Sequence, residues 1–306
     1  MNRNYQKMLT MLLNVGNPLS LKICFKKSGK ILKEIMNNKH QKWKILFIQT
    51  LIILLFALIW QGLGRSSENI FFLIGTPLAV AGEFWQLLIA GNFIGNFFIT
   101  GAEAVVGLLI GTLIGTVLGL SLWFSESAAF IAKPFVTALG ALPVFALAPL
   151  MIVWFGVGFG MKVAIAVFST VFVAFNQAYK GADSVALEYV DTLKGMNASR
   201  SQIFQKVIIP GSLDWVLSSI RLNVGFGLLG AFIGEYISSN EGLGYLILRA
   251  SNLYNIPRAF AAAIGIIALA LILDNIAQFI ERRRYTIVQW ISVPRNFGIV
   301  EVNSRL

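Results

Sequence analysis

Residues 96–124 read NFFITGAEAVVGLLIGTLIGTVLGLSLWF, and Glu103 is the one charged side chain among them. A helix needs about 20 apolar residues to cross the hydrocarbon core of a bilayer. This stretch therefore predicts a membrane-spanning helix. Because an ionisable group inside such a helix is costly and rare, Glu103 is expected to be satisfied by a neighbour or by water. The alternative is that it binds substrate or an ion in a pathway.

Glycines recur every four residues along the same stretch. They are Gly107, Gly111, Gly115 and Gly119. In a helix of 3.6 residues per turn, four-residue steps keep them on one ridge that drifts by about 40° per step. Since glycine lets helix backbones approach closely, the ridge predicts tight helix packing within the subunit. A ridge that lines a dimer interface or a translocation path is the alternative.

The composition of the whole chain agrees with a membrane protein. Of its 306 residues, 57% are hydrophobic and 13% are charged, whereas about 25% are charged in an average soluble domain. This balance excludes a disordered chain and disfavours a soluble enzyme, because too few polar side chains remain to cover a globular surface. With only Cys24 and His40, a disulfide framework and a Cys/His zinc site are excluded within one chain. A Ser/His/Asp triad is not expected, because the single histidine lies in the basic N-terminal arm.

Six stretches are long and apolar enough to cross a membrane. They are residues 43–62, 96–124, 128–154, 161–178, 217–237 and 258–280. The third stretch contains Pro134, Pro143 and Pro149, so it is expected to be kinked or broken. Pro143 and Pro149 are therefore candidates for a pathway or gate. Residues 77–91 are amphipathic, too short and too charged to span, and are placed at the membrane interface.

Nucleotide binding by this chain itself is not expected. Residues 225–230, GFGLLG, have the spacing G-x-G-x-x-G, but they lie inside an apolar span rather than after a strand. They predict close helix packing instead. No P-loop sequence G-x-x-x-x-G-K-[ST] occurs. The chain is therefore expected to hold no cofactor and no metal, and a membrane-embedded enzyme lacks a catalytic set.

Basic residues concentrate on one side of the predicted spans. Residues 1–44, the loop 179–221 and the tail after residue 280, together with Lys133, hold 21 of the 25 Lys and Arg. The positive-inside rule places this side, with both termini, in the cytoplasm. Anionic lipid accounts for the net charge of +11, so no nucleic acid is needed. Residues 1–42 are expected to form a basic cytoplasmic arm on the inner leaflet.

The most informative loop covers residues 188–222, EYVDTLKGMNASRSQIFQKVIIPGSLDWVLSSIRL, and reads as two short helices joined by a turn. Asn197 suits a left-handed backbone in the turn, and the Ser199 hydroxyl can cap the helix that follows. That helix has an apolar face around Phe204 beside basic residues, and Pro210 is expected to interrupt it before the fifth span. A rigid protruding helix of this kind suits insertion into a groove on a partner.

This loop resembles the EAA loop of the permeases of binding-protein-dependent ABC importers. The EAA motif has an acidic residue, two small residues, a glycine six positions after the acid and a proline thirteen positions after the glycine. Counting back from Pro210 places Asn197 at the glycine position and Asp191 at the acidic position. A register from Glu188 and Gly195 breaks the proline spacing by two residues.

The first register departs from the usual motif, since Asp191-Thr192-Leu193 stands for Glu-Ala-Ala and Asn197 for Gly. The resemblance nevertheless implies a set of ATPase-coupling residues. They are Asp191, Asn197, Ala198, Ser199, Arg200, Phe204 and Pro210.

The resemblance runs from about residue 43 to residue 284 and points to the nitrate, sulfonate, taurine and bicarbonate group. Residues 141–158 are similar to that group's proline-rich third span. Residues 230–247 are similar to its fifth-span exit and make Glu235 a further candidate for a pathway or gate. The implied fold is an all-α integral membrane protein of the type I ABC importer permease class, with about six transmembrane helices. A permease domain at 43–284 would contain an EAA-like loop at 188–215 and precede a cytoplasmic tail at 285–306.

The resemblance also implies the partners. Two permease subunits would form the pathway in the cell inner membrane, and a homodimer is favoured by the family's usual arrangement. A cytoplasmic ATPase dimer would bind ATP and Mg²⁺, and a solute-binding protein would deliver substrate from outside. The helix around Ala198–Lys206 would lie in a cleft of the ATPase and carry its closure to the spans, so the chain itself would not be an enzyme.

The substrate is expected from family analogy alone to be a small anion such as a sulfonate, nitrate or bicarbonate. Small heterocyclic vitamin precursors are also transported in the resembled group. A secondary transporter or channel that needs no ATPase is the alternative function. It would require a coupling-ion site or a filter, and the predicted spans carry almost no midplane charge.

Overall fold

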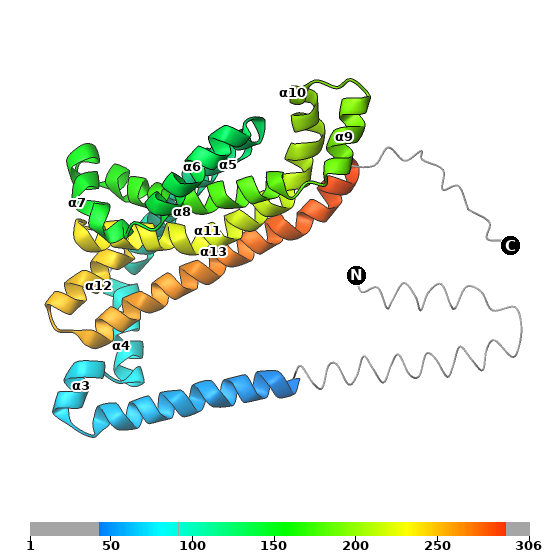
Figure 1. Ribbon diagram of the computed structural model, residues 1–306. Coiled ribbons are helices and arrows are strands. Elements are labelled where there is room, and N and C mark those ends of the chain that lie inside the picture. Colours follow the sequence, from blue (N-terminus) through cyan, green and yellow to red (C-terminus); the bar gives the residue numbers. More distant parts are fainter. Residues whose placement is uncertain (1–42, 91, 292–306) are drawn as a thin grey trace, which may run out of the picture. The chain divides into compact units, whose positions relative to one another are not determined.

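The computed structural model describes residues 43–90 and 92–291, with side-chain surroundings up to residue 282. Within these ranges every regular element is a helix (Figure 1). Five helices are long and apolar enough to cross a membrane, and there are up to seven spans if each of two bent pairs counts as one. The expected all-α membrane protein with about six spans is confirmed. The predicted arm at 1–42 and residues 292–306 of the predicted tail lie outside the described residues.

The chain divides into two compact units between Phe71 and Phe72. The first unit contains the helix Trp43–Arg65, which has the length and composition of a membrane span. Its apolar side chains, such as Phe47 and Ile53, are exposed within the unit, as expected of a span that faces lipid. The boundary falls within the short helix α3 (Glu68–Ile74).

The second unit holds the bundle in which the predicted sites lie. Its elements are α4 (Pro77–Ala90), α5 (Phe93–Ser121), η1 (Leu122–Phe124), α6 (Glu126–Gly140), α7 (Val144–Phe155), α8 (Phe159–Asp183), α9 (Leu187–Gly195), α10 (Arg200–Ile203), η2 (Phe204–Ile208), α11 (Ile209–Ile237), α12 (Leu243–Asn252) and α13 (Ile256–Ile291). Helices α5, α8 and α11 pack on one another, and α13 packs on α11. In Figure 1, α9 and α10 lie at one end of these long helices and α12 lies at the other.

Two pairs of helices are bent rather than straight. Helices α6 and α7 meet at 93°, which confirms that the third predicted span is broken. Pro143 is the N-cap of α7, a position near the helix start where the missing amide hydrogen of proline is tolerated. Pro149 lies inside α7, where it removes one hydrogen bond of the helix. All of α4 lies within residues 77–91, the stretch expected at the interface, and α4 makes the second bent pair with α3 at 49°.

The glycine ridge of α5 lies against α8. A Cβ added to any of the four glycines would overlap atoms of α8, from Ala166 beside Gly107 to the carbonyl oxygen of Phe175 beside Gly119. Neighbouring backbones can approach this closely only where side chains are missing. The ridge therefore makes a helix contact within one chain and fixes α5 to α8.

Candidate coupling segment and a buried polar network

The turn of the predicted coupling loop follows α9 and is built around Asn197. Its φ angle is 58°, in the left-handed region that asparagine tolerates better than most residues. The Asn197 amide donates to the Lys194 carbonyl oxygen at 2.9 Å, and the Ala198 amide donates to that of Leu193 at 3.0 Å. These bonds close the carboxyl end of α9, so the turn is held firmly to that helix.

Ser199 starts the next helix through a reciprocal capping box. The backbone amide of Gln202 donates to Ser199 Oγ at 3.3 Å, and the backbone amide of Ser199 donates to the side-chain oxygen Oε1 of Gln202 at 2.8 Å. Two amides that a helix start leaves without intrahelical partners are satisfied in this way. Ser199 therefore caps the helix as the sequence indicates, with Gln202 as a partner that the sequence analysis did not name.

Pro210 does not interrupt the helix that Ser199 begins, contrary to the expectation from sequence. Helix α10 passes through the π turn η2 into α11, and the result is one continuous helix, Arg200–Ile237, of 38 residues. Proline lacks an amide hydrogen and crowds the preceding turn of a helix. The π turn just before Pro210 accommodates the missing hydrogen bond and the crowded ring. The coupling segment, defined here as residues 187–210, therefore joins the fifth span without a break.

The apolar face of α10 and η2 packs inside the chain. Ile203 and Ile208 are buried, and the Phe204 ring centroid lies 4.6 Å from that of Phe124 and 5.7 Å from that of Trp123. The spacing of apolar residues predicts that a helix face is covered but not what covers it. From sequence, this face is expected to enter a groove on a partner, whereas η1 of the same chain covers much of it.

Helix α9 instead presents apolar side chains outward. Tyr189 and Met196, seven residues apart and therefore on the same side of the helix, are 66% and 74% exposed, and we call these two residues the α9 face. An exposed ion pair joins Asp191 and Lys194 at 3.1 Å on the same helix. The sequence analysis did not single out the α9 face, because a helix of nine residues shows too little periodicity to reveal an unpaired face.

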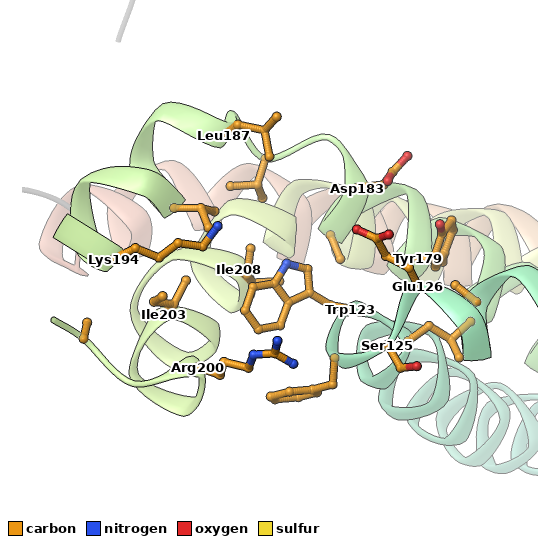
Figure 2. Close-up of a pocket in the computed structure, with 17 residues that line it drawn as sticks. Trp123, Ser125, Glu126, Tyr179, Asp183, Leu187, Lys194, Arg200, Ile203 and Ile208 are labelled. Carbon is orange, nitrogen blue, oxygen red and sulfur yellow. The ribbon is translucent and has the colours of Figure 1, made fainter.

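A pocket of about 810 Å³ is lined by the coupling segment, η1, the start of α6 and the end of α8. Figure 2 shows Trp123 on its wall, with Lys194 and Arg200 on one side and Glu126 and Asp183 on the other. Within the described part of the chain, Arg200 has no ion-pair partner. The coupling segment therefore rests on the bundle through its aromatic contact, beside a cavity lined by charges of both signs.

Glu103 of α5 forms an ion pair with Lys162 of α8. The two side chains are 0% and 2% exposed. Gly234 of α11 leaves room for the lysine, since a Cβ there would lie 2.9 Å from Lys162 Cγ. Lys162 thus balances the charge of Glu103, although neither carboxylate oxygen of Glu103 has a hydrogen-bond partner among the described residues. Lys162 was missed as a site residue because it lies at the end of a predicted span, where a basic residue is ordinary.

Glu235 of α11 lies in the same buried region and accepts two hydrogen bonds. The Thr100 hydroxyl of α5 donates to Oε1 at 2.6 Å. The Gly244 amide, at the start of α12, donates to Oε2 at 2.6 Å. Buried carboxylates are stable only when they are paired or hydrogen-bonded, so these contacts explain how Glu235 is accommodated.

Two further amides of the same helix start are held by α5. The Leu243 amide donates to Thr100 Oγ1 at 2.8 Å, and the Gly242 amide donates to Asn96 Oδ1 at 2.6 Å. Three successive amides of one helix start therefore meet side chains from two other helices. We call this arrangement the Glu235 network, and its members are Asn96, Thr100, Glu235 and the amides of Gly242, Leu243 and Gly244.

Asp274, an ionisable residue inside the sixth predicted span, is paired across helices. Arg221 Nε of α11 lies 3.0 Å from Asp274 Oδ1, and Gln278 Nε2 donates to Oδ2 at 2.8 Å. Among the described residues, no group of three or more His, Cys, Asp or Glu side chains could hold a metal ion. Asp274 thus pairs with Arg221 of another helix, as Glu103 pairs with Lys162.

The bundle of long apolar helices, one of which begins at the coupling loop, has the features of a multi-span membrane protein. The sequence model of one family, described as the binding-protein-dependent transport system inner membrane component, matches residues 107–285. The chain belongs to this family.

Curated relatives agree with this assignment. A probable ABC transporter permease of Haemophilus influenzae is 30% identical over 75% of this chain and 94% of its own. The formylaminopyrimidine transport permease ThiX of Halalkalibacterium halodurans is 29% identical over 74% of this chain and 93% of its own. A putative aliphatic sulfonates permease, SsuC of Bacillus subtilis, is 26% identical over 84% of this chain and 92% of its own.

Solved structures support the fold. The MetNI methionine ABC transporter, in an inward-facing conformation, matches with a TM-score of 0.55 at 17% identity, over 66% of this chain and 96% of that chain. A bacterial ABC transporter involved in alginate import matches with a TM-score of 0.56 at 14% identity, over 82% of this chain and 99% of that chain. The chain is therefore a non-catalytic permease subunit of an ABC importer, with the type I permease fold and the EAA loop typical of the family.

Proposed function

We propose that this permease subunit couples closure of a cytoplasmic ATPase dimer to alternating access of a transport pathway. The observation that carries the proposal is the continuous helix Arg200–Ile237, which begins at the capped turn and ends in the fifth span. At 1.5 Å per residue, its 38 residues make a rod of about 57 Å. A displacement of the turn is therefore delivered to the far end of the span without an intervening loop.

The α9 face is the surface that we assign to the ATPase. Tyr189 and Met196 leave most of their apolar surface uncovered, and covering one such side chain stabilises a complex by about 1.5–3 kcal/mol. The exposed charges of Asp191 and Lys194 on the same helix suit the polar rim of an interface. ATP and Mg²⁺ would bind to the ATPase, and ATP could shift the permease only by its different affinity for the two states.

Ser199→Ala tests the rod. It removes the acceptor of the Gln202 amide, and loss of such a cap costs about 1 kcal/mol. We expect the turn to loosen, so that less substrate is transported per ATP hydrolysed in proteoliposomes while the binding protein still docks. Ser201→Ala is the matched control, because that exposed serine caps no helix. Unchanged transport per ATP hydrolysed in Ser199→Ala would contradict the proposal. Proton-driven uptake by the permease without any ATPase would favour a secondary transporter instead.

For the substrate we propose a small anion such as a sulfonate, nitrate or bicarbonate. The support is the likeness to an aliphatic sulfonates permease, whereas the likeness to a formylaminopyrimidine permease favours a heterocyclic vitamin precursor. Uptake of radiolabelled ethanesulfonate and of a labelled aminopyrimidine by the reconstituted complex separates the two. Uptake of the pyrimidine alone would remove the anion proposal.

We further propose a homodimer in the cell inner membrane, with both termini in the cytoplasm and a solute-binding protein on the outer side. The excess of basic residues in the same segments supports this orientation. In a Cys24→Ser background, Met196→Cys should react with an impermeant maleimide in inside-out vesicles only. Labelling in right-side-out vesicles would reverse the orientation.

A further inference from the structure

The start of α12 is capped entirely by other helices. The first amides of a helix have no partner within it, and the N-cap residue Gly242, with φ of 105°, has no side chain to offer. Asn96, Thr100 and Glu235 supply the missing acceptors. The position of α12 is therefore set by hydrogen bonds to α5 and α11 as well as by apolar packing.

The side chains of the Glu235 network are buried. Thr100 and Glu235 are 0% exposed and Asn96 is 5% exposed. A Cβ on Gly242 would overlap the Glu235 carboxylate, and one on Gly244 would lie 2.9 Å from Glu235 Oε2. The carboxylate thus fills the space in front of the helix start. Opening the network would leave several buried polar groups without partners, which is strongly unfavourable.

We infer that Asn96, Thr100 and Glu235 are positioning residues that lock the start of α12 to α5 and α11 throughout the transport cycle. Glu235 lies two residues before the end of the rod Arg200–Ile237, so α12 follows the rod when the rod moves. Helix α12 packs on α13, and the movement therefore reaches the sixth span. The inference rests on the proposed function, because it requires a moving rod. Glu235 acts as a hydrogen-bond acceptor and not as a gate that binds substrate.

Thr100→Val opens the network with little change in side-chain volume. It removes the acceptor of the Leu243 amide and one donor to Glu235. Thr100→Ser keeps the hydroxyl and serves as the conservative rescue. Thr116→Val is the matched control on the same helix, because the Thr116 hydroxyl has no hydrogen-bond partner among the described residues.

Hydrogen–deuterium exchange of residues 239–247, in the permease–ATPase complex with and without a non-hydrolysable ATP analogue, tests the lock. The unchanged protein, Thr100→Ser and Thr116→Val should protect the amides of 242–244 in both nucleotide states. Thr100→Val should exchange about tenfold faster, as loss of one buried hydrogen bond predicts. Loss of protection in one nucleotide state of the unchanged protein would overturn the inference, as would full protection in Thr100→Val.

Transport by the same complexes separates positioning from mere folding. At equal amounts of assembled complex, Thr100→Val should lower uptake per ATP hydrolysed at least several-fold, and Thr100→Ser should restore it. Glu235→Gln should stay active, because the side-chain oxygen of glutamine can still accept from the Gly244 amide. The Thr100 hydroxyl can then donate to the backbone carbonyl oxygen of Asn96, which lies 3.1 Å away. Loss of transport in Glu235→Gln with an intact network would show a gating charge instead. Failure of the ATPase to co-purify would count against the proposed function, whereas exchange in the permease alone would still report the lock.

Discussion

Lys162 can stay buried between the helices because Glu103 compensates its charge. An isolated ammonium group in such surroundings carries a penalty of several kcal/mol, and so does the carboxylate that faces it. The pair also joins the amino end of α8 to α5, beside the start of the glycine ridge. At the scale of residues, the charges inside this bundle are therefore structural groups that hold helices in place.

Lys162→Met should lower the free energy of unfolding by about 3–5 kcal/mol, because it leaves the Glu103 carboxylate buried and uncompensated. Lys162→Met combined with Glu103→Leu should recover most of that loss, since an apolar pair of similar volume has no charge to desolvate. Unfolding by a denaturing detergent added to mixed micelles measures the free energy of unfolding of the single and the double variant. A double variant as unstable as the sum of the two single variants would show that the residues do not act as a pair.

At the scale of elements, the apolar spans and the break at Pro143 could be predicted from sequence, because length, hydropathy and proline act locally. The capping role of Ser199 could be predicted for the same reason. The continuity through Pro210 could not, since it depends on a π turn that no local pattern announces. Nor could the partners of Glu103 and Glu235, because hydrogen bonds between helices distant in sequence arise only from the packed bundle.

Glycine-to-alanine substitutions inside and outside the glycine ridge should change the stability of the bundle in opposite directions. Gly115→Ala should destabilise the bundle by about 1–3 kcal/mol, because the added methyl group meets the backbone of α8, which cannot move aside. Gly225→Ala in α11 should instead stabilise by about 0.5–1 kcal/mol, since its Cβ meets nothing within 4 Å and alanine favours the helix. Thermal aggregation of the purified variants in detergent reports the order, and equal effects would mean that the ridge is not a tight contact.

At the scale of the whole molecule, the second unit has a mechanical layout. The coupling segment lies at one end of the rod Arg200–Ile237 and the Glu235 network lies at the other. The π turn at Phe204–Ile208 is the irregular place along the rod, and the rings of Trp123 and Phe124 support it there. A displacement of the α9 face would therefore be transmitted along the rod, past the contact of Phe204 with Trp123 and Phe124, to α12 and α13. Alternating access requires such a transmitted displacement.

Cross-linking from the α9 face tests this account most directly. In a Cys24→Ser background, a photoreactive group on Met196→Cys should capture one protein, an ABC ATPase subunit, and the yield should change when ATP is added. The same group on Leu78→Cys of α4, another exposed apolar position, should not capture it. Capture of no ATPase from Met196 in a transporting complex, or modification of Met196→Cys only from outside the cell, would contradict the account.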